Sequence, residues 1–317
     1  MPHPVNRFIS ESDNHAALEA LKTIIYFSIF NYPLKLDEIC NFSVSKNKDG
    51  IQKDLEELVS KKVIFKVDDY YLMAQHRESI EKRIMGNQMA VNALVKAKER
   101  ASFIAKFPFV EAVGVSGSLS KGYYDKDSDI DFFVITQPDK VWLCRTFLML
   151  YKKLFLLNSR KYFCINYFMS SANLEVQEKN RFTATEIKTL MPFHGKNPFE
   201  EFYKRNEWVS GIFAEFVPQL DTIENIKKPK AVRMAEVIFD TQLGNALDHS
   251  FKKITVHFWK IKFSQMAHED FKVALKSTKH ISKHHPLNFQ KKVIGALNEK
   301  YEEIKRNHNI ELPKEYV

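Results

Sequence analysis

Hydrophobic and polar residues follow two different periods along this chain. Residues 14–30 place apolar side chains three and four positions apart, which is typical of an amphipathic helix. Asn31-Tyr-Pro33 ends that pattern. Shorter elements are expected next, namely helices at residues 34–42 and 51–61 and a hairpin made of two apolar runs at residues 63–67 and 70–73.

Three helices followed by a hairpin resemble a winged helix over residues 1–76. Winged helices often bind DNA, and the third helix would then be the reader. Its exposed side mixes acidic and basic residues, whereas DNA readers usually cluster Lys or Arg against phosphates. We therefore expect a structural or protein-contact role, with DNA as a less favoured partner. The exposed residues are Lys53, Asp54, Glu56, Glu57 and Lys61.

The middle of the chain predicts a small mixed sheet with flanking helices. A long charged helix over residues 77–106 leads into it and ends at Phe107-Pro108. After Ser170 the spacing predicts helices, so the fold class is α+β with a C-terminal helical domain. The expected domains are a winged-helix-like domain at 1–76, a sheet domain with its connector helix at 77–172, and a basic helical domain at 173–317.

The candidate ligand-binding residues lie between Val115 and Thr136. A short apolar strand runs into Gly117-Ser118, where glycine lets the backbone approach an anion closely. Asp129 and Asp131 stand at the start of the next apolar run. Residues two apart in a strand point to one face, about 7 Å apart. Two such carboxylates suit a hard divalent cation, so the stretch predicts a site for a metal-bound nucleotide.

Gly-Ser, a spacer of about ten residues and Asp-x-Asp on a strand resemble the nucleotidyltransferase fold of the DNA polymerase beta superfamily over residues 86–170. The resemblance implies that Gly117 and Ser118 hold the triphosphate of a nucleotide. It also implies that Asp129 and Asp131 hold Mg²⁺ (or Mn²⁺) and act as catalytic residues. Lys121 lies inside the glycine loop and is a further candidate for phosphate contact. The implied activity is transfer of a nucleoside monophosphate from a nucleoside triphosphate to an acceptor.

The third strand departs from the pattern of that superfamily. Its members usually carry a third carboxylate there, but the expected strand at residues 162–169 has Asn166 as its central polar residue. An amide binds metal weakly and cannot act as a base. Glu175, nine residues later, is not expected to reach the site. A non-catalytic nucleotide-binding protein, or a DNA-associated regulator, therefore remains as an alternative function.

Two other ligand-binding motifs fit the same residues poorly. A calcium loop starting at Asp125 would need Gly at its sixth position and Glu at its twelfth, where Ile130 and Thr136 stand. A phosphate-binding P-loop would need Lys after Gly122, where Tyr123 stands. A solvated acidic turn without a ligand is the remaining structural alternative.

Charge and composition narrow the class of protein. The chain has a formal charge of +9, and residues 227–317 hold 18 Lys and Arg against 10 Asp and Glu. This asymmetry suits an anionic partner or a solvated basic surface. For the acceptor of the transfer, the sequence leaves three classes open: a small molecule, RNA and a protein side chain. His280 and His284 would share one face if a helix extends there, but no zinc ligand set is spaced around them.

The cellular location is expected to be cytoplasmic. The three cysteines are far apart and show no metal spacing, which suits buried thiols in a reducing compartment. The N-terminus lacks a signal-peptide pattern. The most apolar run, at residues 141–157, is interrupted by Arg145, Lys152 and Lys153, so no membrane partner is expected.

Overall fold

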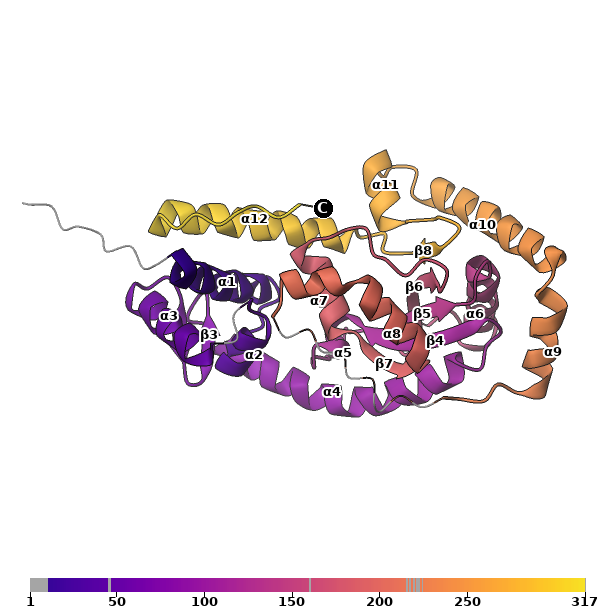
Figure 1. Ribbon diagram of the computed structural model, residues 1–317, viewed down its shortest axis with the longest axis horizontal. Helices are drawn as coiled ribbons and strands as arrows, with labels where there is room; N and C mark the ends of the chain where they lie inside the picture. The colour runs from indigo at the N-terminus through magenta and orange to yellow at the C-terminus, as the bar shows by residue number, and fades with distance from the viewer. Residues whose placement is uncertain are drawn as a thin grey trace, which may run out of the picture. The chain divides into compact units, whose positions relative to one another are not determined.

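The structure, a computed structural model, describes residues 11–44, 47–159, 161–214, 216, 218, 220, 223 and 225–316, and the side chains from residue 17 onward. The chain separates into two compact units (Figure 1). Unit 1 combines Met1–Ile84, Trp208–Val217 and Lys292–Val317, and unit 2 combines Met85–Glu207 and Pro218–Lys291. The division of the chain at residues 76/77 and 172/173 stays a prediction.

Unit 1 contains three helices and a three-stranded antiparallel sheet within its N-terminal segment. Its strand order is β1-β3-β2, so the predicted hairpin pairs with an additional short strand. The winged-helix assignment stays a prediction. The elements are α1 (Glu11–Ser28), β1 (Leu34–Lys35), α2 (Leu36–Asn41), α3 (Lys48–Ser60), β2 (Phe65–Val67) and β3 (Tyr70–Leu72).

The core of unit 1 follows the predicted periodicity. Ile51, Leu55 and Leu58 of α3 are buried, as their spacing of three and four residues requires. The helix begins after Asn47, whose side-chain oxygen accepts a hydrogen bond from the backbone N–H of Gly50. The helix predicted over residues 34–42 is shorter, because Leu34 and Lys35 pair with β3 instead.

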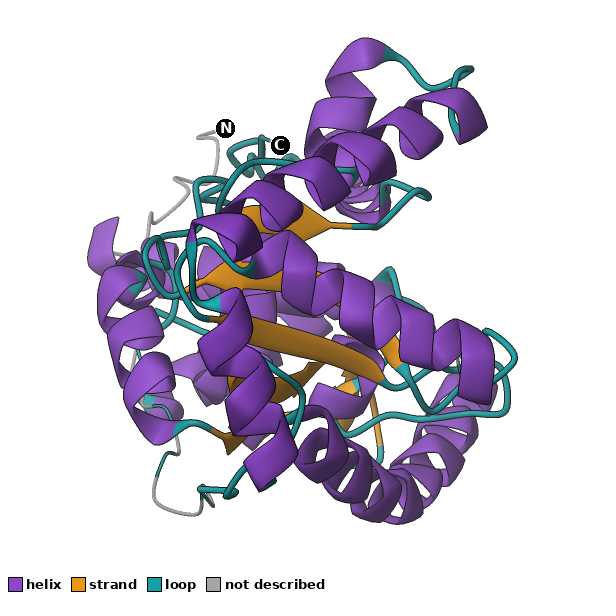
Figure 2. Cartoon of the chain, turned by 90° about the vertical axis from the view of Figure 1, so that its right-hand side faces the viewer, coloured by secondary structure: helices purple, strands orange, loops and turns teal. Residues whose placement is uncertain are grey.

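Unit 2 is built on a five-stranded mixed sheet, which Figure 2 shows with helices on both sides. The long helix α4 (Arg77–Ile104) begins in unit 1 and continues into unit 2. The other elements of unit 2 are β4 (Val110–Ser116), α5 (Gly117–Ser120), β5 (Asp131–Thr136), α6 (Val141–Phe155), β6 (Cys164–Ser170), α7 (Arg181–Thr189), β7 (Met191–His194), α8 (Lys196–Arg205), α9 (Lys230–Phe239), α10 (Gln242–Lys262), α11 (His268–Ala274) and β8 (Ile281–Lys283).

The sheet has the strand order β7-β4-β5-β6-β8, with β5 and β6 parallel and the remaining pairs antiparallel. Side chains alternate between its two faces. Phe132 and Val134 belong to the apolar cluster formed with α4 and α6. Phe133 contacts the rings of Phe199 and Phe202 on α8, so α8 covers the face to which Asp131 also points. Two covered faces explain why β5 is an almost continuous apolar run.

Two strands were missed in the segment predicted to be helical. β7 pairs with β4 at one edge of the sheet, and α8 starts directly afterwards. β8 pairs with β6 and extends the other edge of the sheet. These strands have only four and three residues, so their sequences carry little periodicity. η1 (Glu207–Gly211) and α12 (Phe289–His308) complete the elements of the chain.

Most of the segment after Ser170 is helical, as its spacing predicts. Residues 230–262 divide into α9 and α10. α8 ends at Arg205 and is followed by η1. His280 and His284 do not share a helix face, because β8 lies between them.

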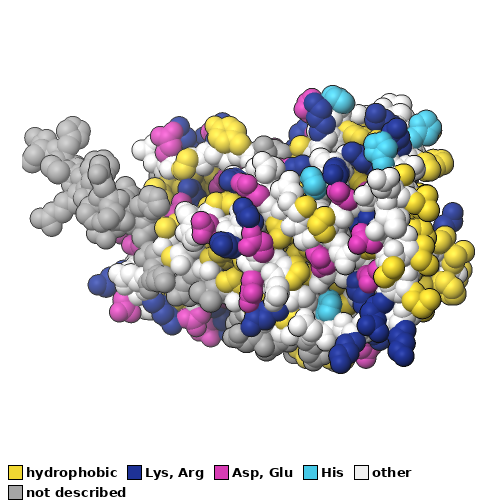
Figure 3. All heavy atoms as spheres, turned by 45° about the vertical axis from the view of Figure 1, so that its right-hand side comes forward, with side chains coloured by type: hydrophobic (Ala, Val, Ile, Leu, Met, Phe, Trp, Pro, Cys, Tyr) yellow, Lys and Arg dark blue, Asp and Glu magenta, His cyan; other side chains and the backbone are white. Residues whose placement is uncertain are grey.

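The basic excess of residues 227–317 is partly neutralised by ion pairs. Figure 3 shows Lys and Arg side chains close to Asp and Glu over much of one face. An anionic partner for this region stays a prediction. Pairs within unit 2 are Lys272–Glu269, Lys276–Glu178, Lys279–Asp139 and Lys291–Asp270. Among the described residues, no helix is long and apolar enough to cross a lipid bilayer.

Gly195 has a backbone conformation that other residues rarely adopt, and this gives a test of the fold. It joins β7 to α8 with φ 84° and ψ 70°, and an added Cβ would collide with the backbone oxygen of Glu111. We expect Gly195→Ala to lower the free energy of unfolding by about 2–4 kcal/mol. Gly295→Ala is the matched control, since Gly295 lies within α12 with no atom near an added Cβ.

The control substitution should raise stability by about 0.5–1 kcal/mol, because Ala favours a helix over Gly. Urea unfolding followed by circular dichroism measures both values. Equal midpoints for the two variants would show that the turn at Gly195 is not required.

Candidate active site

The glycine turn after β4 lies directly against the Asp131 carboxyl group. Gly117 has φ +73°, and a Cβ at this position would stand 2.7 Å from Asp131 Oδ2. Ser116, the last residue of β4, pairs with Asp131, the first residue of β5. Glycine is therefore required here both for the turn and for the close approach. The predicted arrangement of strand, glycine turn and strand is confirmed.

Asp131 is a partly buried acid held by neighbours on the adjacent strand. Asn166 Nδ2 donates a hydrogen bond to Asp131 Oδ1 at 2.9 Å and lies 3.1 Å from Cys164 Sγ. The pKa of Asp131 is raised to about 6, chiefly by burial and also by the charges of Asp129 and Glu186, whereas a hydrogen bond with Cys164 and the charge of Lys121 oppose the shift. Two other acidic groups thus act on Asp131 at this end of the sheet.

Asp129 precedes the strand rather than lying on it. β5 begins at Asp131, and the buried side chain of Ile130 separates the two acids. The strand-face argument therefore applies to Asp131 alone. The charge of Asp129 still raises the pKa of Asp131, so the two carboxylates are close enough to repel each other.

Asn166 occupies the position on the third strand where the predicted resemblance implies an acid. The register between β5 and β6 shifts at this residue, since Phe132 pairs with Ile165 and Phe133 with Tyr167. The irregularity lets the Asn166 amide turn toward Asp131. An amide N–H donates to the carboxylate, whereas a third carboxylate would repel it.

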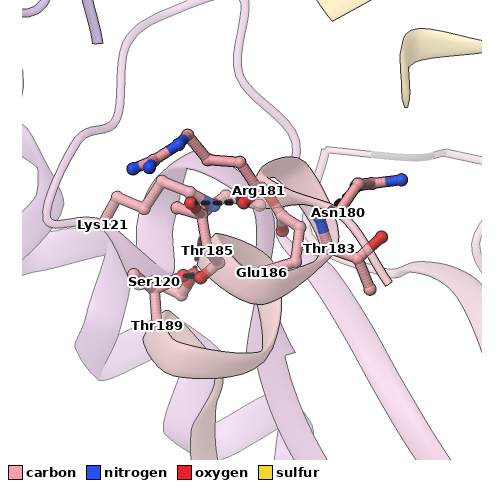
Figure 4. A network of polar contacts seen from close by, with 9 residues as sticks. Ser120, Lys121, Asn180, Arg181, Thr183, Thr185, Glu186 and Thr189 are labelled. Atoms are coloured by element: carbon pink, nitrogen blue, oxygen red, sulfur yellow. Dashed lines mark hydrogen bonds and ion pairs between the residues drawn. The ribbon is translucent and has the colours of Figure 1, made fainter. Parts of the chain in front are cut away.

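Lys121 connects the glycine turn to α7. Its Nζ donates to the backbone oxygen of Gly117 at 3.0 Å and to Glu186 Oε1 at 2.7 Å. Figure 4 shows Lys121 reaching from its turn to Glu186 on α7. The side chains of Lys121 and Glu186 are 15% and 28% exposed, so solvent screens this ion pair only in part. A Lys that contacts the turn and an acid together can exchange partners when an anion enters.

The Ser118 hydroxyl makes no hydrogen bond to the described residues, although its backbone oxygen accepts from the N–H groups of Lys121 and Tyr123. Ser120 instead closes the turn, because its hydroxyl donates to the oxygen of Gly117 at 2.9 Å. The turn is thus shaped by backbone contacts, and the Ser118 side chain is available to a ligand.

Glu186 is the site residue that sequence reasoning missed. Thr183 and Glu186 have the spacing of a capping box, which predicts a helix start at Thr183. The helix instead starts after Asn180, whose Oδ1 accepts from the backbone N–H of Thr183 at 3.0 Å. Glu186 is therefore not a capping residue, and its carboxylate faces Lys121. Glu175, by contrast, pairs with Lys179 on the surface.

Asp125 shapes the connection between the two strands. Its Oδ1 accepts from the Ser128 hydroxyl at 2.7 Å and from the backbone N–H of Asp127 at 3.1 Å, and its Oδ2 accepts from the Tyr123 hydroxyl. These bonds form a closed polar turn. Asp125 is thus a structural residue of the loop that presents Asp129.

Arg145, a basic residue that interrupts the apolar run of α6, packs against aromatic rings. Its guanidinium packs over the rings of Trp142 and Trp259, and burial lowers its pKa to about 10. It contributes to packing between α6 and α10.

The residues at this site fit a hard divalent cation. Asp129 and Asp131 supply oxygen ligands of the type that Mg²⁺ or Mn²⁺ prefers, and a cation between them would relieve their repulsion. Within the part of the chain that the structure describes, no group of three or more His, Cys, Asp or Glu side chains is arranged to hold a metal ion. Asp129 and Asp131 are thus the two acids that would hold such a cation.

Comparison with known families agrees with this geometry. Residues 94–208 match a family model described as a nucleotidyltransferase domain. The chain carries a nucleotidyltransferase domain. The match extends past β6 through α7, β7 and α8, so it includes Glu186 as well as the glycine turn and both Asp residues. No curated protein and no solved structure matches the chain.

The electrostatics of Asp131 give a pH-dependent prediction for the nucleotidyltransferase domain. The Asp131 pKa of about 6 in the folded protein lies above its ordinary value of 3.8. Between these pH values the folded protein therefore keeps a proton that the unfolded chain has lost. Wild-type stability should therefore fall as pH rises through this window. In metal-free buffer, Asp131→Asn should raise the free energy of unfolding at pH 7.5 by about 1–2 kcal/mol, with no gain at pH 4.

The measurement is urea unfolding of both proteins across this pH range. Asp127→Asn is the control, because Asp127 is an exposed acid in the same loop. A gain from Asp131→Asn that does not change with pH would contradict the assigned electrostatics.

Proposed function

We propose that the protein transfers a nucleoside monophosphate from a nucleoside triphosphate to an acceptor in a reaction that depends on Mg²⁺ or Mn²⁺. The observation that carries the proposal is the contact between the Gly117 turn and the Asp131 carboxyl, with Asp129 beside it. A phosphate-binding turn and a cation-binding acid pair thus adjoin at the end of one sheet.

The residues of the turn would bind the polyphosphate. Backbone N–H groups at Gly117, the hydroxyl of Ser118 and the ammonium group of Lys121 are donors suited to phosphate oxygens. Asp129 and Asp131 would hold the cation, which supplies charge neutralisation when bound. Holding the phosphates in place aligns the α-phosphorus with the acceptor. The acceptor oxygen forms a bond to the α-phosphorus, the bond to the bridging oxygen breaks, and pyrophosphate leaves.

The acceptor would approach from the side of β8. Lys283 pairs with Tyr167, the residue after Asn166, and the register directs both side chains to the face that carries Phe133 and Asp131. Lys283 Nζ donates to Gln290 Oε1 at 3.1 Å, and burial lowers the pKa of its ammonium group. The location suits contact with a polar or anionic acceptor. His284, in contrast, packs on the rings of Trp259 and Phe263.

A second candidate function is nucleotide binding without catalysis. The feature that favours it is the hydrogen bond from Asn166 to Asp131, which places an amide where the third carboxylate is expected. A protein of this kind would bind the nucleotide and use it to set its conformation.

Pyrophosphate release distinguishes the two functions. The full-length protein is incubated with Mg²⁺, each of the four labelled ribonucleoside triphosphates and a cell extract that supplies acceptors. We expect release with at least one nucleotide, and a loss of about 10²-fold or more in the variant with Asp129→Ala and Asp131→Ala, because it lacks the cation ligands.

The single variant Asp127→Ala should keep wild-type activity, since this residue is exposed in the loop before Asp129. Equal release by wild type and the double variant would remove the catalytic assignment. Nucleotide binding with no release would support the non-catalytic function.

A separate variant tests the acceptor side. Lys283→Met should raise the apparent KM for the acceptor by about tenfold while leaving the nucleotide KM nearly unchanged, because it removes one buried cation on that side. His284→Phe is the control, since it keeps an aromatic ring against Trp259 and Phe263. An unchanged acceptor KM in Lys283→Met would contradict this assignment.

A further inference from the structure

The proposed reaction needs a group that takes the proton of the acceptor. The amide of Asn166 cannot do so, and its hydrogen bond to Asp131 shows that this position serves as a donor. Asp129 and Asp131 are assigned to the cation. A further carboxylate near the site would complete the chemistry.

Glu186 is the acid that the fold brings there. α7 presents its carboxylate to Lys121 beside the Gly117 turn, and that turn lies against Asp131 Oδ2. Its Oε1 accepts from Lys121, which in turn contacts the backbone oxygen of Gly117. Glu186 is therefore connected through Lys121 to the turn assigned to the phosphates, and that turn adjoins the acid assigned to the cation.

The helix that carries Glu186 is fixed independently of that side chain. Asn180 caps the helix, and the hydroxyls of Thr185 and Thr189 donate to helix carbonyls at 2.8 Å. Ser120 on the turn lies 3.5 Å from the Thr189 hydroxyl, so α7 also contacts the turn at a second point (Figure 4). Oε2 of Glu186 has no hydrogen-bond partner in the described residues. One carboxylate oxygen is thus bound by Lys121 and the other is available.

We propose that Glu186 is the catalytic base of the transfer, replacing from a helix the carboxylate that the third strand lacks. This inference rests on the proposed function. The acceptor O–H gives its proton to the Glu186 carboxylate while its oxygen bonds to the α-phosphorus. The bond between the α-phosphorus and the bridging oxygen breaks, and its electron pair leaves with pyrophosphate.

Lys121 couples nucleotide binding to this step. While the Lys121 ammonium group donates to Glu186 Oε1, that oxygen is not available to an acceptor proton. The polyphosphate carries several negative charges and competes for Lys121, so the Lys turns toward the phosphates and releases Glu186. The base is thereby set free only when the nucleotide is in place, which limits unproductive proton transfer.

The test separates a base from a residue that merely positions Lys121. Glu186→Gln keeps an oxygen that accepts from Lys121 but removes the proton acceptor. We expect kcat to fall by about 10²–10⁴-fold, with the equilibrium Kd for a non-hydrolysable nucleotide and Mg²⁺ within about threefold of wild type. Glu186→Asp should recover part of kcat. Lys121→Met should mainly raise the nucleotide Kd.

Glu175→Gln is the matched control, because Glu175 is also paired with a Lys but lies on the surface. Thermal unfolding of each variant shows that the fold is retained. A kcat within threefold of wild type in Glu186→Gln would overturn the inference, as would a loss of nucleotide affinity as large as that of Lys121→Met. Wild-type protein that releases no pyrophosphate would instead refute the proposed function, and the role of Glu186 with it.

Discussion

The close approach between the Gly117 turn and the Asp131 carboxyl is the constraint on which the site depends. Gly117 has a positive φ and no side chain to meet this carboxylate, and the pairing of Ser116 with Asp131 fixes the contact within the sheet. Burial and neighbouring acids make the charged form of Asp131 costly. The fold thus maintains a repulsive arrangement of acids beside a turn suited to anions, as expected where a cation and a phosphate meet.

The sheet supplies the rigidity that this arrangement needs. β5 lies in its centre, covered by α4 and α6 on one face and by α8 on the other, so Asp131 is the first residue of a strand that cannot shift. The Asn166 irregularity in β6 then directs an amide toward the acid. The proposed site lies at the end of β5, whereas the apolar remainder of that strand is packed in the core and fixes the position of Asp131.

In our proposal, Glu186 on α7 replaces the carboxylate that is missing from the third strand, where Asn166 stands. A carboxylate on a helix can pair with Lys121 in one state and accept a proton in another, because its position is not fixed by the strand register. The same acid on β6 would be held permanently beside Asp131. Moving the acid to α7 therefore makes its availability depend on whether Lys121 contacts the carboxylate or the nucleotide.

The sequence by itself determined the local parts of the site: the glycine turn, the two Asp residues and the amide on the third strand, as well as the helix–hairpin order of residues 14–73. These features are encoded by neighbouring residues through backbone freedom and periodicity. Only the tertiary structure decided that β7 and β8 join the sheet and that Glu186 meets Lys121. Short strands carry little periodicity, and Asn180 rather than Thr183 caps α7. Such choices depend on contacts between residues far apart in the chain, which local patterns do not record.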